Sequence, residues 1–214
     1  MRRILIATLG VALLTGTVLA VRGAAAGPPA PAAEATAAAG HQHPAAATSG
    51  GGGKGLASQL AKARLATARY ATSLKAAKAD GYGIITRMIP DMGYHFLNPS
   101  IQGFDVTKPH ILVYERRGGS WTLGALEWVS PSTPTTPPLP GATYGSFGAA
   151  CHYKDGTFVF AAAQDDCAKR SPETGAAFNF WHPDLVTLHV WLWYHNPDGL
   201  YSGTNPLVQP FNRG

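Results

Sequence analysis

The sequence predicts an α+β domain in which one long N-terminal helix packs on a mainly antiparallel β-sheet with long loops. Two observations predict this class. An alanine-rich segment without Gly or Pro comes first, and several short segments typical of strands come after it, separated by turns rich in Gly and Pro. The chain shows no internal repeat, so we expect residues 56–214 to form a single domain.

The predicted helix covers Leu56 to Asp80, which contains no Gly or Pro and is rich in Ala. Apolar or aromatic side chains recur there at alternating steps of four and three residues, the spacing of one helix face. Gly81 comes next as a residue suited to end a helix. The apolar stripe has to pack against another element, and the residues after Gly83 are predicted to form the sheet that covers it.

The clearest hairpin joins residues 110–115 to residues 121–129, since both segments are rich in β-branched and aromatic residues. Residues 116–120, Arg-Arg-Gly-Gly-Ser, lie between them as a turn. The segment 130–150 holds five prolines among Ser, Thr and Gly, and we expect a long surface loop there.

A second hairpin is expected over residues 151–160, where Asp155-Gly156 suits a primed two-residue turn. The last predicted strand runs from Leu185 to Tyr194 and ends before the turn at Asn196-Pro197. With these segments the sheet is expected to contain four or five strands.

The first 55 residues differ in composition from the rest. Arg2-Arg3, an apolar run over residues 4–21 and small residues up to Ala26 have the order of a secretory signal peptide. The alternative is an uncleaved N-terminal anchor, because about 20 apolar residues span a bilayer. Residues 27–55 hold no large apolar side chain and are expected to be a disordered tether. Its His41-Gln42-His43 is either a weak copper or zinc site or a pair of solvated histidines.

The net charge of +5 overstates the basicity of the exported chain. Three arginines and no acid lie in residues 1–26, so the remainder carries about +2. No Lys/Arg cluster with interleaved aromatics is present, and we expect no nucleic-acid partner. A membrane partner is expected only through the N-terminal segment, if it stays uncleaved. The protein is therefore predicted to be secreted or extracytoplasmic, or tethered to the membrane by that segment.

The chain has two cysteines, Cys151 and Cys167. In an exported protein an even pair predicts a disulfide. Fifteen residues lie between them, and a loop of that length predicts roughly 3 kcal/mol of stabilisation. The alternative, two metal thiolates, lacks a C-x-x-C pair.

Six of the eight histidines lie in the predicted domain, and imidazole is the commonest ligand for zinc and copper. His189 and His195 would lie roughly 20 Å apart on a strand, at ~3.3 Å per residue, so both cannot hold one ion. We therefore assign His195 to the turn.

Glu127 lies among apolar neighbours in a predicted strand, where a carboxylate is costly unless it is paired, hydrogen-bonded or metal-bound. It is a residue at a sheet edge, or one paired with an arginine such as Arg87, or a ligand or general base facing imidazoles. The first functional hypothesis is thus a site for a divalent zinc, copper or iron ion built from His95, Glu127, His182 and His189.

The second hypothesis is a non-catalytic binding module for a sugar, an aromatic or a lipid-like molecule. Trp191 and Trp193 would then line a cleft, unless they fill the core instead. A serine hydrolase is disfavoured, because Ser146 lies outside any G-x-S-x-G pattern. The sequence does not decide whether the protein is an enzyme.

Four strings, MGYHFLNP, HILVYE, ALEWV and LHVWLWYHNPDGLYSGTNPLV, resemble those of a group of exported bacterial proteins. The resemblance covers residues 56–211, and the last string is its most specific part. It implies an exported, single-domain protein. The group has no established activity, so the resemblance assigns no catalytic residue.

Overall fold

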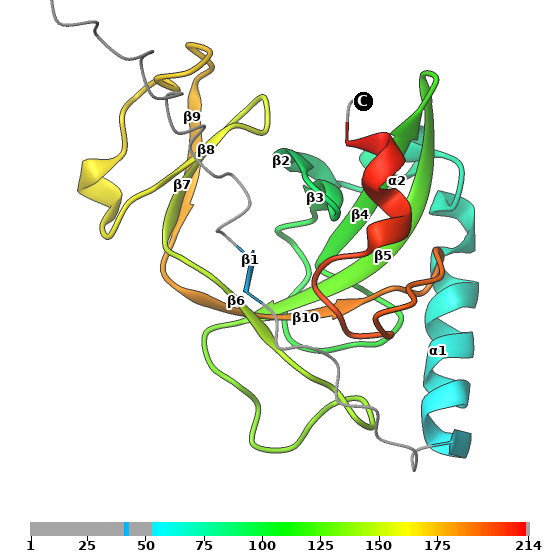
Figure 1. The fold of residues 1–214 in the computed structure, drawn as a ribbon. Coiled ribbons are helices and arrows are strands. Elements are labelled where there is room, and N and C mark those ends of the chain that lie inside the picture. The colour runs from blue at the N-terminus through cyan, green and yellow to red at the C-terminus, as the bar shows by residue number, and fades with distance from the viewer. Residues whose placement is uncertain (1–40, 43–52, 213–214) are drawn as a thin grey trace, which may run out of the picture. The chain divides into compact units, whose positions relative to one another are not determined.

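The structure is a computed structural model that describes residues 41–42 and 53–212 (Figure 1). The predicted signal peptide or anchor, residues 1–26, lies outside these ranges, as does most of the predicted tether, residues 27–55. In the described part of the chain, no helix has the length and apolar character needed to cross a bilayer.

The predicted α+β class is wrong, because the described residues form a mainly β structure. In place of one helix over 56–80 there are three short ones, namely α1 (Gly53–Thr67), the 3-10 helix η2 (Ala68–Tyr70) and α2 (Leu74–Ala79). Helix α1 begins inside the predicted tether. Two further 3-10 helices are η3 (Gln164–Asp166) and η4 (Pro206–Phe211).

The helix breaks after Thr67 because the sheet takes up backbone carbonyls of the next residues. The Tyr114 hydroxyl donates to the Tyr70 carbonyl at 2.8 Å, and the Leu123 N–H donates to the Ala71 carbonyl at 2.8 Å. Ser73 then restarts the helix as an N-cap, since its hydroxyl accepts from the Ala76 N–H. The helical periodicity of the sequence gives no sign that donors distant in the chain will bind these carbonyls.

Ten strands of the described residues form two sheets in which every pairing is antiparallel. The large sheet has the order β1-β6-β10-β5-β4-β3-β2. Its strands are β1 (His41–Gln42), β2 (Gly83–Ile89), β3 (Gly93–Leu97), β4 (Ile111–Arg117), β5 (Ser120–Ser130), β6 (Gly145–Phe147) and β10 (Leu185–Val190). The small sheet has the order β8-β7-β9, with β7 (Ala150–Tyr153), β8 (Phe158–Phe160) and β9 (Phe178–His182).

Both predicted hairpins form. Strands β4 and β5 pair as far as Arg117 and Ser120, so Gly118 and Gly119 make the two-residue loop, both with positive φ. The turn between β7 and β8 differs from the prediction. Only Gly156 has positive φ there, and the loop holds three residues closed by the Tyr153 N–H on the Thr157 carbonyl.

The two faces of the large sheet bury different partners. Helices α1 and α2 contribute Ala63, Leu74 and Ala77 to one core, together with alternate sheet residues Leu112, Leu126, Leu188 and Val190. Figure 1 shows α1 alongside this sheet. The opposite face carries Val113 and Ala125 and packs against Val208 and Phe211 of η4. The candidate site lies on this second face, away from α1.

Candidate functional site

The sheet register brings three of the predicted ligands to one face. His189 on β10 lies directly opposite Glu127 on β5, and His95 on β3 lies opposite Val113, which shares a face with Ala125 and Glu127. All three side chains are buried, with His95 1% exposed and Glu127 and His189 fully covered. Strand β3 was not predicted as a strand, so its pairing could not be foreseen.

His95 faces Glu127 across the interior. Its Nδ1 hydrogen-bonds with the Thr86 hydroxyl at 2.8 Å, and its Nε2 lies 3.7 Å from Oε2 of Glu127. The His95 and His189 ring centroids are 6.4 Å apart. Burial raises the pKa of Glu127 to about 8, because the low-dielectric interior disfavours the carboxylate.

Arg87, the alternative partner of Glu127, is engaged elsewhere. Its guanidinium forms ion pairs with Asp155 and, at 3.3 Å, with Glu173. These contacts fasten the edge of β2 to the turn of the small sheet. The interpretation of Glu127 as the partner of Arg87 is therefore wrong.

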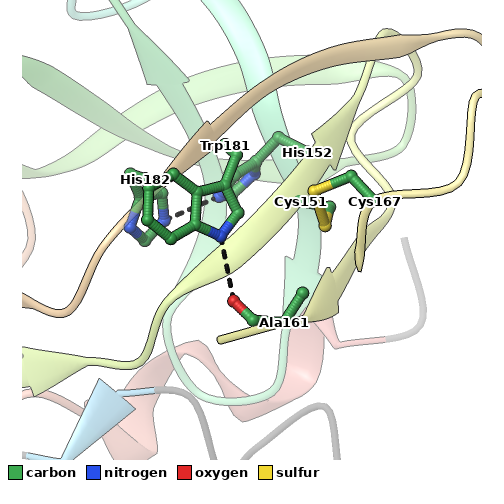
Figure 2. The surroundings of a disulfide bond; sticks show 6 residues. All are labelled: Cys151, His152, Ala161, Cys167, Trp181 and His182. Atoms are coloured by element: carbon green, nitrogen blue, oxygen red, sulfur yellow. Dashed lines mark hydrogen bonds between the residues drawn. A yellow bond between two sulfur atoms is a disulfide. The ribbon is translucent and has the colours of Figure 1, made fainter. Parts of the chain in front are cut away.

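The fourth predicted ligand, His182, lies at the end of β9 and meets a histidine that the sequence hypothesis left out. Nε2 of His182 and Nε2 of His152 on β7 are 3.0 Å apart (Figure 2). His152 is 1% exposed and stacks on Phe180, with ring centroids 4.7 Å apart and planes 10° apart. His182 is partly exposed and forms the outer member of the pair.

The Nδ1 atom of each imidazole forms a hydrogen bond with a backbone carbonyl oxygen. His152 Nδ1 lies 2.8 Å from the Ile85 carbonyl oxygen, and His182 Nδ1 lies 2.6 Å from the Pro183 carbonyl oxygen. A carbonyl oxygen only accepts, so each Nδ1 carries the hydrogen and donates it. In a neutral imidazole the other nitrogen is then a lone-pair acceptor. The two Nε2 atoms therefore point lone pairs at each other.

The contacts of the pair also outnumber its donors. The three contacts, Ile85 to His152, His152 to His182 and His182 to Pro183, need three N–H donors, whereas two neutral imidazoles supply two. Protonating one ring is opposed by burial, which lowers the pKa of His152 to about 4 and also lowers the pKa of His182. Near neutral pH two neutral rings therefore leave the contact between the two Nε2 atoms without a hydrogen.

A cavity of about 150 Å³ brings the two pairs together. Its lining includes His95 and Glu127 from the large sheet and His152 and His182 from the small one. The remaining lining is apolar side chains and two threonines, namely Ile85, Leu97, Ile111, Val129, Phe147, Phe180, Leu185, Thr86 and Thr187. Three of the four predicted ligands therefore share one cavity with His152, while His189 does not line it.

Within residues 41–42 and 53–212, no group of three or more His, Cys, Asp or Glu side chains is close enough to hold a metal ion. The candidate ligands form two pairs on one cavity, and they are not gathered around a common point. The pairing of β9 with β7 sets the position of His152, and β9 was not predicted from the sequence. The one available signal was that His152 comes directly after a cysteine in a predicted hairpin.

The predicted disulfide is confirmed. Cys151 and Cys167 are joined with a Cα–Cα distance of 5.6 Å, and the described residues include no free cysteine. Cys151 of the bridge comes directly before His152 on β7, the strand that carries one of the two imidazoles (Figure 2). A disulfide fits an extracytoplasmic location, where oxidising conditions maintain it.

Trp191 and Trp193 lie beyond the end of β10, because the predicted strand 185–194 stops at Val190. Trp191 is buried beside His189 and donates its indole N–H to the Ser202 carbonyl at 2.7 Å. Trp193 donates to the Thr67 hydroxyl. Both tryptophans lie outside the lining of the imidazole cavity. His195 is an exposed loop residue, as predicted.

Comparison of the chain with family models, with curated proteins and with solved structures gives no match. The case for a function therefore rests on the geometry of the chain itself.

Proposed function

We propose that this protein is an extracytoplasmic metal-binding protein that holds one zinc, copper or iron ion at the His152–His182 pair. The observation that carries the proposal is the 3.0 Å approach of two Nε2 atoms whose Nδ1 atoms both donate to backbone carbonyls. A donor contact at the far nitrogen is what fixes the tautomer and orientation of metal-bound histidines.

The spacing of the pair is close to what an ion requires. At metal–nitrogen bonds of about 2.0–2.1 Å, two tetrahedral ligands lie roughly 3.3 Å apart, so the imidazoles would separate by only a few tenths of an ångström. His95 and Glu127 line the same cavity and are the candidates to complete the coordination, although in the structure they are not gathered with the pair around a common point. We leave His189 out of the proposed site, because it does not line the cavity.

We also propose that residues 1–26 direct export and are removed as a signal peptide. The disulfide supports this location because it needs an oxidising compartment. N-terminal sequencing of the mature protein tests the point. A start near residue 27 is expected, and an N-terminus that retains the apolar run would indicate a membrane anchor instead.

The metal site is tested with tag-free protein in which His41 and His43 are replaced by Ala, since that motif could bind metal by itself. Zn(II), Cu(II), Cu(I) and Fe(II) are offered separately, and bound metal is measured by elemental analysis and chelator competition. We expect one ion per chain for at least one metal. His152→Phe and His182→Phe should each abolish binding, because Phe preserves the aromatic packing and removes the ligand.

His195→Phe is the matched control, since His195 is exposed in a loop and does not line the cavity. It should bind the ion as the parent does. Circular dichroism checks that each variant is folded. The proposal fails if none of the four ions binds, or if binding persists in both cavity variants.

A further inference from the structure

The basic residues of the domain are concentrated in its helical segment. Residues 53–79, which span α1, η2 and α2, contain six Lys or Arg and no Asp or Glu. Residues 80–214 contain eight Lys or Arg and eleven Asp or Glu, so their formal net charge is −3. The helical segment thus carries a formal charge of +6 beside an acidic remainder, an asymmetry typical of proteins that bind an anionic surface through one face.

The fold places these charges on one side of the large sheet. Ala63, Tyr70, Leu74 and Ala77, one or more from each of the three helices, belong to the core that covers a single face of this sheet. The exposed side chains of the same helices therefore project away from that face, toward solvent. Figure 1 shows α1 at the edge of the fold, on the side away from β7, β8 and β9.

Three lysines of this helical layer have charges that the protein leaves unpaired. Lys62, Lys75 and Lys78 are exposed, and no ion pair within the described part of the chain includes them. Arg69 is paired with Asp80 at 2.6 Å, but 63% of its side chain remains exposed. Arg64 is instead held against the domain by the Trp193 ring and the Leu192 carbonyl.

An apolar side chain lies among these charges. Leu65 is 81% exposed on α1. Lys62, Leu65 and Arg69 follow one another at steps of three and four residues, so they lie along one side of the helix. A bilayer surface accommodates both kinds of side chain, because lipid phosphates attract the cations and the boundary below the headgroups takes up apolar groups. A polyanion in solution, such as polyphosphate, would bind the cations only.

We propose that the outer side of α1, η2 and α2 docks on a membrane surface that contains anionic lipids. Lys62, Lys75 and Lys78 would contact the lipid phosphates, and Leu65 would enter the boundary below them. The imidazole cavity lies on the opposite face of the large sheet, so docking would leave it accessible. This contact needs neither an uncleaved N-terminal segment nor a bound metal.

Cosedimentation with lipid vesicles tests the proposal. The mature, tag-free chain is used, so that the apolar run over residues 4–21 is absent. Vesicles of equal parts phosphatidylglycerol and phosphatidylcholine are compared with vesicles of phosphatidylcholine alone. We expect binding to the anionic vesicles to be at least about tenfold tighter. High salt should remove most of this difference, because exposed charges are screened.

Two triple variants with the same change in net charge locate the contact. The first combines Lys62→Gln, Lys75→Gln and Lys78→Gln, and it should weaken binding to anionic vesicles by about a hundredfold, at about fivefold per lysine. The matched control replaces three exposed lysines outside the helices, namely Lys108→Gln, Lys154→Gln and Lys169→Gln. It should bind within about threefold of the parent, since charges far from the contact are screened. Circular dichroism checks that both are folded.

Leu65→Ser distinguishes a bilayer from a polyanion in solution. It should weaken binding to anionic vesicles by about tenfold, because the apolar contact is lost. Any binding of polyphosphate should be unchanged by this variant.

Three results would overturn the proposal: no binding to anionic vesicles at low salt, equal weakening by the two triple variants, or vesicle binding unaffected by Leu65→Ser. The last result, together with tight polyphosphate binding, would indicate a polyanion as the partner. His152→Phe should bind vesicles as the parent does, so this test is independent of the metal proposal.

Discussion

His152 and His182 face each other through Nε2 atoms 3.0 Å apart, while each Nδ1 donates to a backbone carbonyl. This relationship links two strands of the small sheet by a contact that two neutral rings cannot satisfy alone. A bound cation would turn a repulsive contact into a favourable one, and the predictions about metal depend on this change.

Metal should raise the thermal stability of the parent protein but not of His152→Phe. An ion that binds only the folded state stabilises it by about 2.7 kcal/mol at a free concentration 100 times the dissociation constant. Differential scanning calorimetry with and without the bound metal measures the effect. His195→Phe should show the same increase in Tm as the parent, and an equal increase in His152→Phe would argue against the pair as ligands.

Glu127→Gln should weaken metal binding by about tenfold, which corresponds to about 1.4 kcal/mol. Among the described residues, Glu127 is the one acidic side chain on the lining of the imidazole cavity, and its carboxylate can offset the charge of a bound cation. Chelator competition measures the change. Glu173→Gln is the control, because Glu173 is exposed and its partner is Arg87. Equal affinity in both variants would place the ion away from Glu127.

Glu115→Gln should make stability less dependent on pH. Glu115 is 2% exposed, and burial, with the nearby charge of Asp91, raises its pKa from 4.5 to about 8. Between these values the folded protein keeps a proton that the unfolded chain releases, so Glu115 contributes stability that is lost as pH rises toward 8.

Urea unfolding between pH 5 and pH 8 checks this sign. The stability of the variant relative to the parent should rise by at most about 1.4 kcal/mol per pH unit. Glu173→Gln, at the surface, should run parallel to the parent. A constant difference between Glu115→Gln and the parent across this range would mean that Glu115 does not hold the extra proton.

Replacing both cysteines by serine should cost roughly 3 kcal/mol, because the disulfide closes a loop with 15 residues between its ends. Chemical denaturation of the double variant, compared with the oxidised parent, measures this loss. The reduced parent should resemble the variant. A loss of unfolding free energy well below about 1 kcal/mol would mean that residual structure already restrains residues 151–167 in the unfolded chain without the disulfide.

Gly93→Ala should be strongly destabilising, by roughly 2–4 kcal/mol. Its φ is +114°, and an added Cβ would lie 2.6 Å from Oε1 of Glu115 and 2.7 Å from the Tyr114 carbonyl oxygen. Gly103→Ala is the matched control, because its φ is also positive, at +66°, but an added Cβ would meet nothing within 4 Å. Thermal unfolding of the two variants compares the steric effect directly, and equal losses would contradict it.

Local pattern predicted the elements that depend on neighbours in sequence. The hairpin closed by Gly118 and Gly119 and the disulfide at Cys151 could be predicted from composition and spacing, and both are present. The helix over 56–80 failed because Leu123 and Tyr114, far along the chain, bind carbonyls in its middle. Long-range donors of this kind leave no trace in a helical periodicity.

The candidate site was predicted in part for the same reason. Glu127 drew attention because a carboxylate among apolar residues is unusual, and the sheet places it opposite His189. His152 was missed because its importance depends on the pairing of β7 with β9, and Phe178–His182 lacks a clear alternating pattern. The type of a residue can suggest a role in a site, whereas the pairing of strands that brings the residues together is known only from the structure.

The imidazole of His152 contacts both sheets, because its Nδ1 donates to the Ile85 carbonyl on β2 and its Nε2 faces His182 on β9. An ion that changed the orientation of this ring would also change the hydrogen bond between His152 on β7 and Ile85 on β2. If the proposed ion binds, its binding would be coupled to the contact between the two sheets. By thermodynamic reciprocity, a partner that grips the small sheet would tighten or release the ion to the same extent that the ion favours or opposes that partner.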